Sequence, residues 1–245
     1  MSIAGETIDY GPCAFMDEFK HDKVFSSIDR NGRYAYNNQP AMGLWNLTRL
    51  AECLVPLFAQ DDDASIEVAK DILNSYQSSY EQHWLANMRA KTGLTTEVDK
   101  AIAGKDKELI ESLLDIMAQS QADFTLTFFY LSQQQPGSSE QASAQDNALH
   151  ELFVDWRNKW EQRLDHESIS GEQRHVNMQA VNPAYIPRNH QIEAAIRAAE
   201  DHLDFSVFHD LLGVLQNPLV EQKGKDKYML PPQVNEVVRQ TFCGT

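Results

Sequence analysis

Apolar side chains recur at intervals of three and four residues through most of the chain, which is the spacing of one face of an α-helix. The first segment with this pattern runs from Pro40 to Phe58. Pro40 suits the first turn of a helix, and Asn38 is available as its N-terminal cap. Because apolar residues lie on most sides of this predicted helix, we expect it to be buried as the spine of the core.

The same spacing predicts six further helices. The second begins at the acidic run Asp61–Asp63, whose charge complements the positive end of the helix dipole, and Gly93 can end it. Strand patterns are few, so the predicted fold class is mainly α. Near the N-terminus, the turn signal Asn31-Gly32 predicts a short β-hairpin or an irregular segment. The remaining helices are predicted near residues 107–118, 123–133, 149–164, 190–202 and 205–216.

The polar stretch from Gln133 to Asn147 contains proline, glycine and serine and predicts an exposed loop. We do not interpret this loop at 133–147 as a boundary between domains. No internal repeat divides the chain either. Residues 1–245 are therefore predicted to form one helical lobe.

The formal net charge is −15, from 36 acidic and 21 basic residues. Such a surface repels phosphate backbones and anionic lipids, which argues against a protein that binds nucleic acid or membranes. No apolar stretch approaches the roughly 18 residues of a membrane span, and the N-terminus lacks the pattern of a secretory signal. The three cysteines form no C-x-x-C pair, and no H-E-x-x-H occurs, so we predict a cytoplasmic protein without a zinc site.

Candidate chemistry lies at the start of the chain, in the run TIDYGP at residues 7–12. An aspartate, an aromatic residue and a glycine in series are similar to the D-F-G motif of protein kinases, whose aspartate holds a magnesium ion at the nucleotide phosphates. A hard cation prefers carboxylate oxygen, and Gly11 allows the chain to turn directly after Asp9. By itself, the tripeptide is more typical of an ordinary turn.

The context of this motif is more specific, because five segments of the chain resemble the selenoprotein O family. Members of this family are kinase-like proteins that attach AMP to other proteins. The segments follow the family's order and are spread over the whole chain. They are MSIAGETIDYGPCAFMDEF (1–19), D-x-x-GRYAY-x-NQP (29–40), WNLTRLAE (45–52), NPAYIPRNHQIEAAI (182–196) and TFCGT (241–245).

The resemblance implies a kinase-like C-terminal lobe in which Asp9 is both a metal ligand and a contact of the nucleotide phosphates. The implied cofactors are Mg²⁺ (or Mn²⁺) and ATP. In the family, a catalytic loop of the form H-G-V-x-N-T-D-N comes immediately before the M-S-I that starts here at Met1. We therefore expect the proton-acceptor aspartate and the N-terminal lobe to be encoded upstream, and no catalytic residue within this chain. The chain is interpreted as a C-terminal fragment that is inactive alone.

Complete members are implied to transfer AMP from ATP to Ser, Thr or Tyr hydroxyls of protein substrates, with pyrophosphate as the leaving group. The implied partners are these protein substrates and the N-terminal lobe, with no nucleic acid and no membrane. An alternative interpretation is a non-catalytic helical interaction module that kept the lobe and lost the chemistry. One carboxylate supplies one or two oxygens to an ion that prefers about six ligands, so we expect no tight binding of ATP to this chain alone.

Two further groups of residues have two interpretations each. Cys243 lies where some members of the family carry a redox-active residue, and Cys13 is its nearest potential partner. The two alternatives for Cys243 are a regulatory disulfide and a free thiol. A reducing compartment favours the free thiol. Asp29 with Arg33 either orients the segment after the metal-binding turn or caps an ordinary turn, and both interpretations stay open.

Polar residues of the second half of the chain are also candidates. Arg188 and Asn189 are interpreted as hydrogen-bonding backbone near the active site, with a helix cap by Asn189 as the alternative. His190, His202 and His209 fit no common metal-ligand pattern and are interpreted as solvated or capping residues. Four tryptophans are interpreted as core residues, namely Trp45, Trp84, Trp156 and Trp160.

Overall fold

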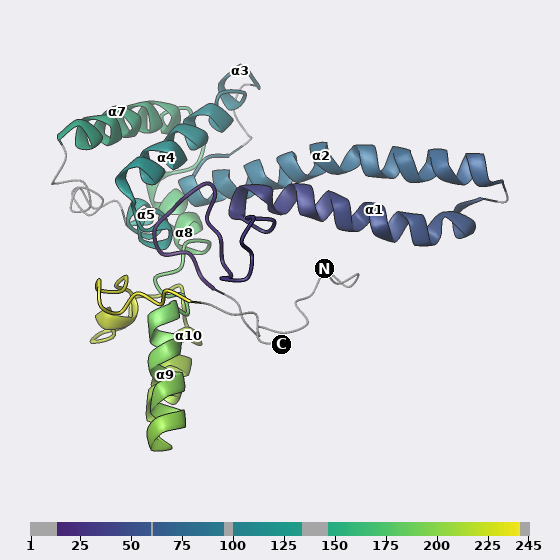
Figure 1. The fold of residues 1–245 in the computed structure, drawn as a ribbon. Helices are drawn as coiled ribbons and strands as arrows, with labels where there is room; N and C mark the ends of the chain where they lie inside the picture. Colours follow the sequence, from purple (N-terminus) through teal and green to yellow (C-terminus); the bar gives the residue numbers. More distant parts are fainter. Residues whose placement is uncertain (1–13, 60, 96–99, 134–146, 241–245) are drawn as a thin grey trace. The chain divides into compact units, whose positions relative to one another are not determined.

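The structure is a computed structural model, and it describes residues 14–59, 61–95, 100–133 and 147–240. Within these ranges the fold is mainly helical, as predicted, and strand pairing is limited to one isolated antiparallel bridge between Glu18 and Asp123 (Figure 1). The elements in chain order are η1 (Tyr36–Asn38), α1 (Gln39–Phe58), α2 (Asp62–Thr92), α3 (Lys100–Ala103), α4 (Asp106–Ser120), α5 (Phe124–Ser132), α7 (Asn147–Leu164), α8 (Gly171–Gln179), α9 (Asn189–His202), α10 (Ser206–Leu215) and η2 (Asp226–Tyr228).

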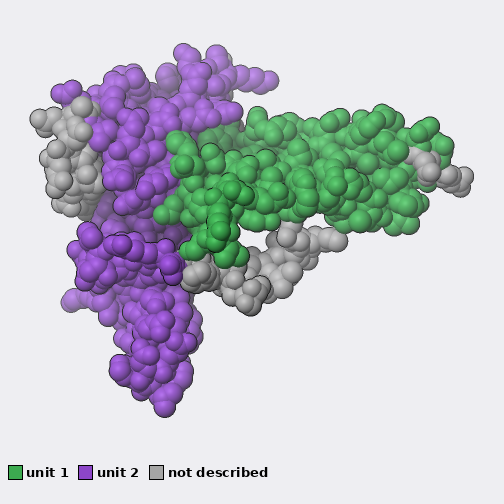
Figure 2. Space-filling model, in the orientation of Figure 1, with its two compact units in different colours: residues 1–13, 21–86, 242–245 green, residues 14–20, 87–241 purple. Residues whose placement is uncertain are grey.

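The chain divides into two compact units (Figure 2). The first comprises residues 1–13, 21–86 and 242–245, and its described part contains η1, α1 and most of α2. The second comprises residues 14–20 and 87–241, and its described part contains the end of α2 and the helices that follow. None of the helices in the described ranges has the length and apolar character needed to cross a bilayer.

Helix boundaries follow local signals in the sequence, and all seven predicted helices are confirmed. Pro40 lies in the first turn of α1, and α2 ends before Gly93, whose φ of 71° favours glycine. Asp123 caps α5, because its side chain accepts the N–H of Leu126 at 2.8 Å. α3 and α8 were not predicted, since the first has four residues and the second is mostly polar. The sequence feature that indicates α8 is its N-terminal cap, Ser170. Most of the polar stretch between α5 and α7 lies outside the described residues.

The segment before α1 is irregular, so of the two predicted alternatives the β-hairpin does not form among the described residues. Gly32 has a φ of 61° and lies in a turn capped by Asp29, whose carboxylate accepts the backbone N–H groups of Arg33 and Tyr34, each at 2.8 Å. The capped turn is thus the interpretation of Asp29 that the structure shows. Asn38 precedes α1 without capping it and instead donates to the carbonyl of Arg33 at 2.7 Å.

The prediction that α1 forms the spine of the core is wrong. Gly43 is the buried residue of this helix, whereas Trp45 is 46% exposed and Leu57 is 77% exposed. Within the first unit α1 lies beside α2, and the hydroxyl of Tyr76 donates to the carbonyl of Pro40 at 3.1 Å (Figure 1). One neighbouring helix covers one face of α1, so apolar residues on its other faces remain in contact with water.

The larger core lies in the second unit, where α4 packs on α7. Trp156 and Trp160 of α7 are buried and stack with ring centroids 5.8 Å apart. Their indole N–H groups donate to the carbonyls of Leu109 and Thr92, each at 2.8 Å. The prediction that the tryptophans are core residues therefore holds for these two, while Trp84 is half-buried and the tryptophan of α1 is exposed.

A buried ion network joins α2, α4 and α7 within the second unit. Asp106, which is fully buried, accepts from Nε of Arg89 and from Nε of Arg163, both at 2.7 Å. Arg163 also donates to Glu167 at 2.8 Å, and Glu167 accepts the backbone N–H of Thr95 at 2.8 Å. The network satisfies charges that would otherwise be costly to bury.

Stability should depend on pH through Glu167. Burial acts to raise the pKa of Glu167, but the hydrogen bonds from Thr95 and the charge of Arg163 outweigh it and hold this pKa below its ordinary value of 4.5. The contribution of this carboxylate is therefore fully present above pH 4.5 and is lost as pH falls through the lowered pKa. In urea unfolding between about pH 5 and pH 3, Glu167→Gln should lose less stability than the unchanged chain. Equal losses would contradict this, and Glu161→Gln, an exposed change on α7, the helix that ends just before Glu167, serves as the control.

Candidate functional site

Three of the predicted site residues, Asp9, Cys13 and Cys243, lie outside the described residues. Their roles in metal binding, nucleotide binding and redox chemistry therefore stay predictions. The described chain begins at Ala14, five residues after Asp9. How this following segment is held is the part of the candidate site that the structure describes.

Asn189 holds the backbone of this segment at Phe15. Its side-chain oxygen accepts the N–H of Phe15 at 3.0 Å, and its side-chain nitrogen donates to the carbonyl of Phe15 at 2.8 Å. The interpretation of Asn189 as a helix cap is wrong, because it is the first residue of α9 and the cap position belongs to Arg188, which makes no side-chain cap bond. The alternative, a hydrogen bond to backbone, is confirmed for Asn189, but it is wrong for Arg188, whose side chain binds carboxylates.

Arg188 holds the same segment through two carboxylates. Its side chain has no exposed surface, and Nη1 donates both to Asp17 and, at 2.7 Å, to Asp123. Nη2 donates to the second oxygen of Asp123 at 3.2 Å, so this pair is bidentate. The three residues come from the N-terminal segment, the cap of α5 and the start of α9. One buried guanidinium thus ties together three distant parts of the chain.

Backbone pairing completes the attachment. The N–H of Phe19 donates to the carbonyl of Ala122 and the N–H of Phe124 donates to the carbonyl of Asp17, both at 2.9 Å. Phe19 is fully buried, and its ring centroid lies 5.7 Å from that of Phe124. We call the contacts of Arg188, Asn189 and residues 122–124 with the segment Ala14–Lys20 the clamp. It holds the segment that begins three residues after the D-Y-G motif in sequence.

The clamp buries one guanidinium against two carboxylates, those of Asp17 and Asp123. Burial alone would lower the pKa of Arg188, but hydrogen bonds and charges of Asp123 and Asp17 prevail and raise it, so the guanidinium stays charged. Burial raises the pKa of Asp123, and the hydrogen bonds from Arg188 and from the N–H of Leu126 act against this rise.

His190, predicted to be solvated or capping, is instead buried, and burial lowers its pKa. The prediction of solvated histidines holds for the two others of this region, His202 and His209.

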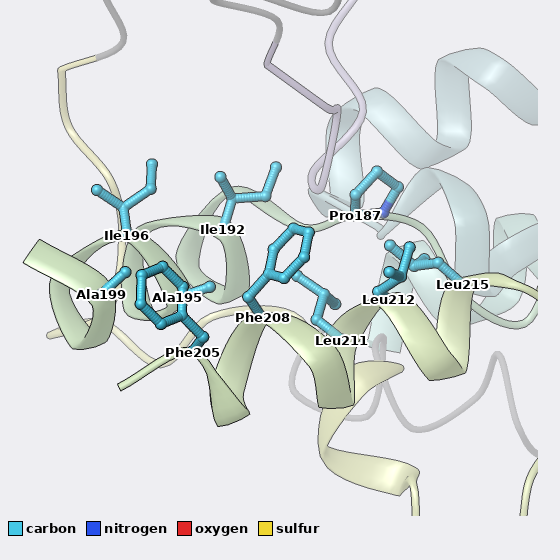
Figure 3. A pocket seen from close by; sticks show the side chains of 10 residues that line it. All are labelled: Pro187, Ile192, Ala195, Ile196, Ala199, Phe205, Phe208, Leu211, Leu212 and Leu215. Atoms are coloured by element: carbon cyan, nitrogen blue, oxygen red, sulfur yellow. The ribbon is translucent and has the colours of Figure 1, made fainter. Parts of the chain in front are cut away.

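A separate groove runs between α9 and α10, with a volume of about 510 Å³ (Figure 3). Phosphate groups require cations or N–H donors, so an apolar groove of this kind does not suit a nucleotide. Exposed aromatic rings at Phe205 and Phe208 make it suited to apolar side chains. The lining side chains are all apolar, namely Pro187, Ile192, Ala195, Ile196, Ala199, Phe205, Phe208, Leu211, Leu212 and Leu215.

The donor chemistry at Asp9 fits the implied Mg²⁺ or Mn²⁺, which take oxygen ligands. The carboxylates of the clamp, Asp17 and Asp123, both form ion pairs with Arg188. Among the described residues no group of three or more His, Cys, Asp or Glu side chains could hold a metal ion. The role of Asp9 as a ligand of the implied metal stays a prediction from the resemblance.

Comparison with known proteins agrees with the motifs. The family model described as protein adenylyltransferase SelO matches residues 1–216, a range that contains the D-Y-G motif and the whole clamp. The chain is 52% identical over 248 residues to a protein nucleotidyltransferase YdiU of Rhodopseudomonas palustris (strain BisB5) and 48% identical over 251 residues to one of Rhizobium meliloti (strain 1021). All of this chain is covered in both matches, but only 49% of each relative, so the chain spans about half the length of these relatives. The chain belongs to the SelO protein adenylyltransferase family.

Proposed function

We propose that this chain is the C-terminal part of an enzyme that transfers AMP from ATP to hydroxyl groups of proteins. The observation that carries the proposal is the family match over residues 1–216, because it includes Asp9 within an intact D-Y-G motif. The clamp supports it, since a metal ligand needs a fixed approach of the chain. The part of the relatives that this chain does not cover would supply the nucleotide-binding lobe and the proton acceptor.

In the proposed reaction, the oxygen of a Ser, Thr or Tyr hydroxyl attacks the α-phosphorus of ATP. The bond between the α-phosphorus and the bridging oxygen breaks, pyrophosphate leaves, and the hydroxyl proton passes to the proton acceptor in the other half. Asp9 would hold Mg²⁺ or Mn²⁺, which when bound neutralises the negative charge of the phosphates. The clamp would orient the segment that carries Asp9, so this half contributes positioning and charge neutralisation.

The isolated chain should show no measurable affinity for ATP, because a single carboxylate leaves most of the metal's roughly six ligand positions to water. Titration calorimetry with Mg-ATP checks this, and micromolar binding would contradict it. Activity should appear when the chain is mixed with the unmatched half of the Rhodopseudomonas palustris relative and ATP labelled at the α-phosphate. Label should then become bound to protein.

Two variants make the test specific. Asp9→Asn should abolish labelling of protein in the mixture, because the amide cannot replace the charged ligand. Asp22→Asn, a nearby exposed aspartate, should leave labelling unchanged. If Asp9→Asn labelled protein as well as the unchanged chain does, the proposed role of Asp9 would be wrong.

A second candidate function is a helical interaction module, and the observation that favours it is the groove between α9 and α10. Near the groove residues in sequence lie the exposed Asp201 and Asp204, together with Glu193 and Glu200, which pair with Arg197. The occupant that fits is an amphipathic helix of a partner protein, with an apolar stripe flanked by basic side chains. Absence of AMP transfer in the mixture described above would favour this function over the enzymatic one.

A further inference from the structure

We infer that the first unit carries a docking surface for an acidic segment of a partner protein, formed by the side chains of Arg33, Tyr34 and Trp45. We call these three side chains the arginine–aromatic patch. Arg33 binds a carboxylate of the partner, and the two aromatic rings pack against an apolar side chain beside that carboxylate. Binding at this patch is independent of the proposed AMP transfer.

The guanidinium of Arg33 lies over the ring of Trp45. Its central carbon is 4.6 Å from the centroid of this ring and 5.7 Å from the centroid of the Tyr34 ring. Arg49 of α1 lies over the same tryptophan at 5.6 Å. A cation–π contact uses the charge of a guanidinium and leaves its N–H groups available as donors. Trp45 therefore orients Arg33 without occupying its hydrogen-bonding groups.

The side chains of the patch are exposed and lack polar partners. Within the part of the chain that the structure describes, the guanidinium of Arg33 makes no hydrogen bond or ion pair, since its contact with Asp29 comes from its backbone N–H. Tyr34 is 56% exposed and Trp45 is 46% exposed. Arginine, tyrosine and tryptophan are the residue types that contribute most to binding at protein interfaces. Their gathering on one exposed surface indicates an interface.

Charge decides which partner fits. Arg49 already pairs with the carboxylate of Glu52, so acidic groups are accommodated beside Trp45. Arg33, without such a partner among the described residues, keeps its positive charge on a chain of net charge −15. That net charge repels nucleic acid and anionic membranes, whose negative charge is extended. A short acidic segment can instead bring a single carboxylate to Arg33, and the two groups match in a bidentate pair.

NMR of the full chain tests the patch through the indole N–H of Trp45, whose signal is the one that Trp45→Phe removes. A peptide of repeated Glu-Leu-Gly units should shift this signal with a dissociation constant of about 0.1 to 1 mM, because the surface is small. The indole signals of Trp156 and Trp160, which are buried, should not move. Added salt should weaken the binding, and a peptide of Gln-Leu-Gly units should not bind.

Two variants and a control identify the residue that recognises the carboxylate. Arg33→Gln should weaken binding of the acidic peptide about 10-fold, because it removes the charged donor. Arg33→Lys, which keeps the charge and loses the planar fork, should give an intermediate loss. Arg197→Gln removes the same charge from an exposed arginine of the second unit and should leave binding unchanged.

Circular dichroism shows which variants keep their helices, and Arg33→Lys keeps the test decisive if Arg33→Gln fails to fold. If the acidic peptide leaves the Trp45 signal in place, or if the folded Arg33 variants bind it as tightly as the unchanged chain does, the patch is not a docking surface for acidic segments. An equal shift with the Gln-Leu-Gly peptide would show that no carboxylate is recognised. An equal shift with inorganic phosphate at the same concentration would show a general anion site, which also overturns the assignment.

Discussion

Replacing Asp106 with alanine is expected to lower the free energy of unfolding by about 3 to 5 kcal/mol. This carboxylate is fully buried and accepts charged hydrogen bonds from Arg89 and Arg163, each at 2.7 Å. Its removal leaves two guanidinium groups without their main partner in places where water has little access. The side chain of Arg163 is only 6% exposed, so solvent cannot compensate for the lost pair.

Urea denaturation followed by circular dichroism measures this loss. Glu108→Ala is the matched control, because Glu108 is an exposed acid in the first turn of the same helix, and its effect should stay within about 0.5 kcal/mol. Asp106→Asn keeps the volume of the side chain and removes its charge, so it should also be clearly destabilising. A loss below about 1 kcal/mol for the alanine variant would show that the network is not essential to the second unit.

Replacing Trp160 with alanine should cost about 3 to 5 kcal/mol of stability, as is typical when a large aromatic residue is removed from a core. Trp160 is 6% exposed, stacks on Trp156, and donates to the carbonyl of Thr92 at 2.8 Å. The alanine variant loses this packing, leaves a cavity beside Trp156, and leaves the carbonyl of Thr92 without its donor. Trp160→Phe keeps most of the packing and loses the hydrogen bond, so it should cost about 1 to 3 kcal/mol.

The contrasting variant is Trp45→Ala. Trp45 is 46% exposed on α1, so its removal should cost less than about 1 kcal/mol in the same urea experiment. Comparing Trp45→Ala with Trp160→Ala distinguishes a core built around α1 from a core built around α4 and α7. If Trp45→Ala were as destabilising as Trp160→Ala, the sequence-based prediction that α1 is the spine would be right and the burial seen in the structure would be wrong.

Helices were predictable from this sequence because their apolar positions recur at helical spacing and their ends carry local signals. Burial was less predictable, and α1 shows why. An apolar surface on most sides of a helix indicates that the helix can be buried, but only the other elements decide how much of it they cover. α8 was missed for a related reason, since a nine-residue polar helix depends on its cap and its neighbours more than on a periodic pattern.

The candidate site was predictable to the extent that motifs mark it. Family resemblance predicts a role for Asp9, which lies outside the described residues, and a second motif contains Arg188 and Asn189. Asp17 and Asp123 were missed as their partners, because a contact across 171 or 65 residues leaves no local pattern. One sequence feature did mark Asp17, since it lies in the first of the family-like segments while Arg188 lies in the fourth.

The thin packing of α1 has a consequence for how the protein opens. A helix with one buried residue contributes little free energy to a shared core, so separating α1 from the first part of α2 costs much less than unfolding the second unit. Amide hydrogens of α1 should therefore exchange through local opening, while those of α4 and α7 should exchange only when the second unit unfolds globally. The clamp lies in the second unit, so its contacts with the segment Ala14–Lys20 should persist while α1 opens.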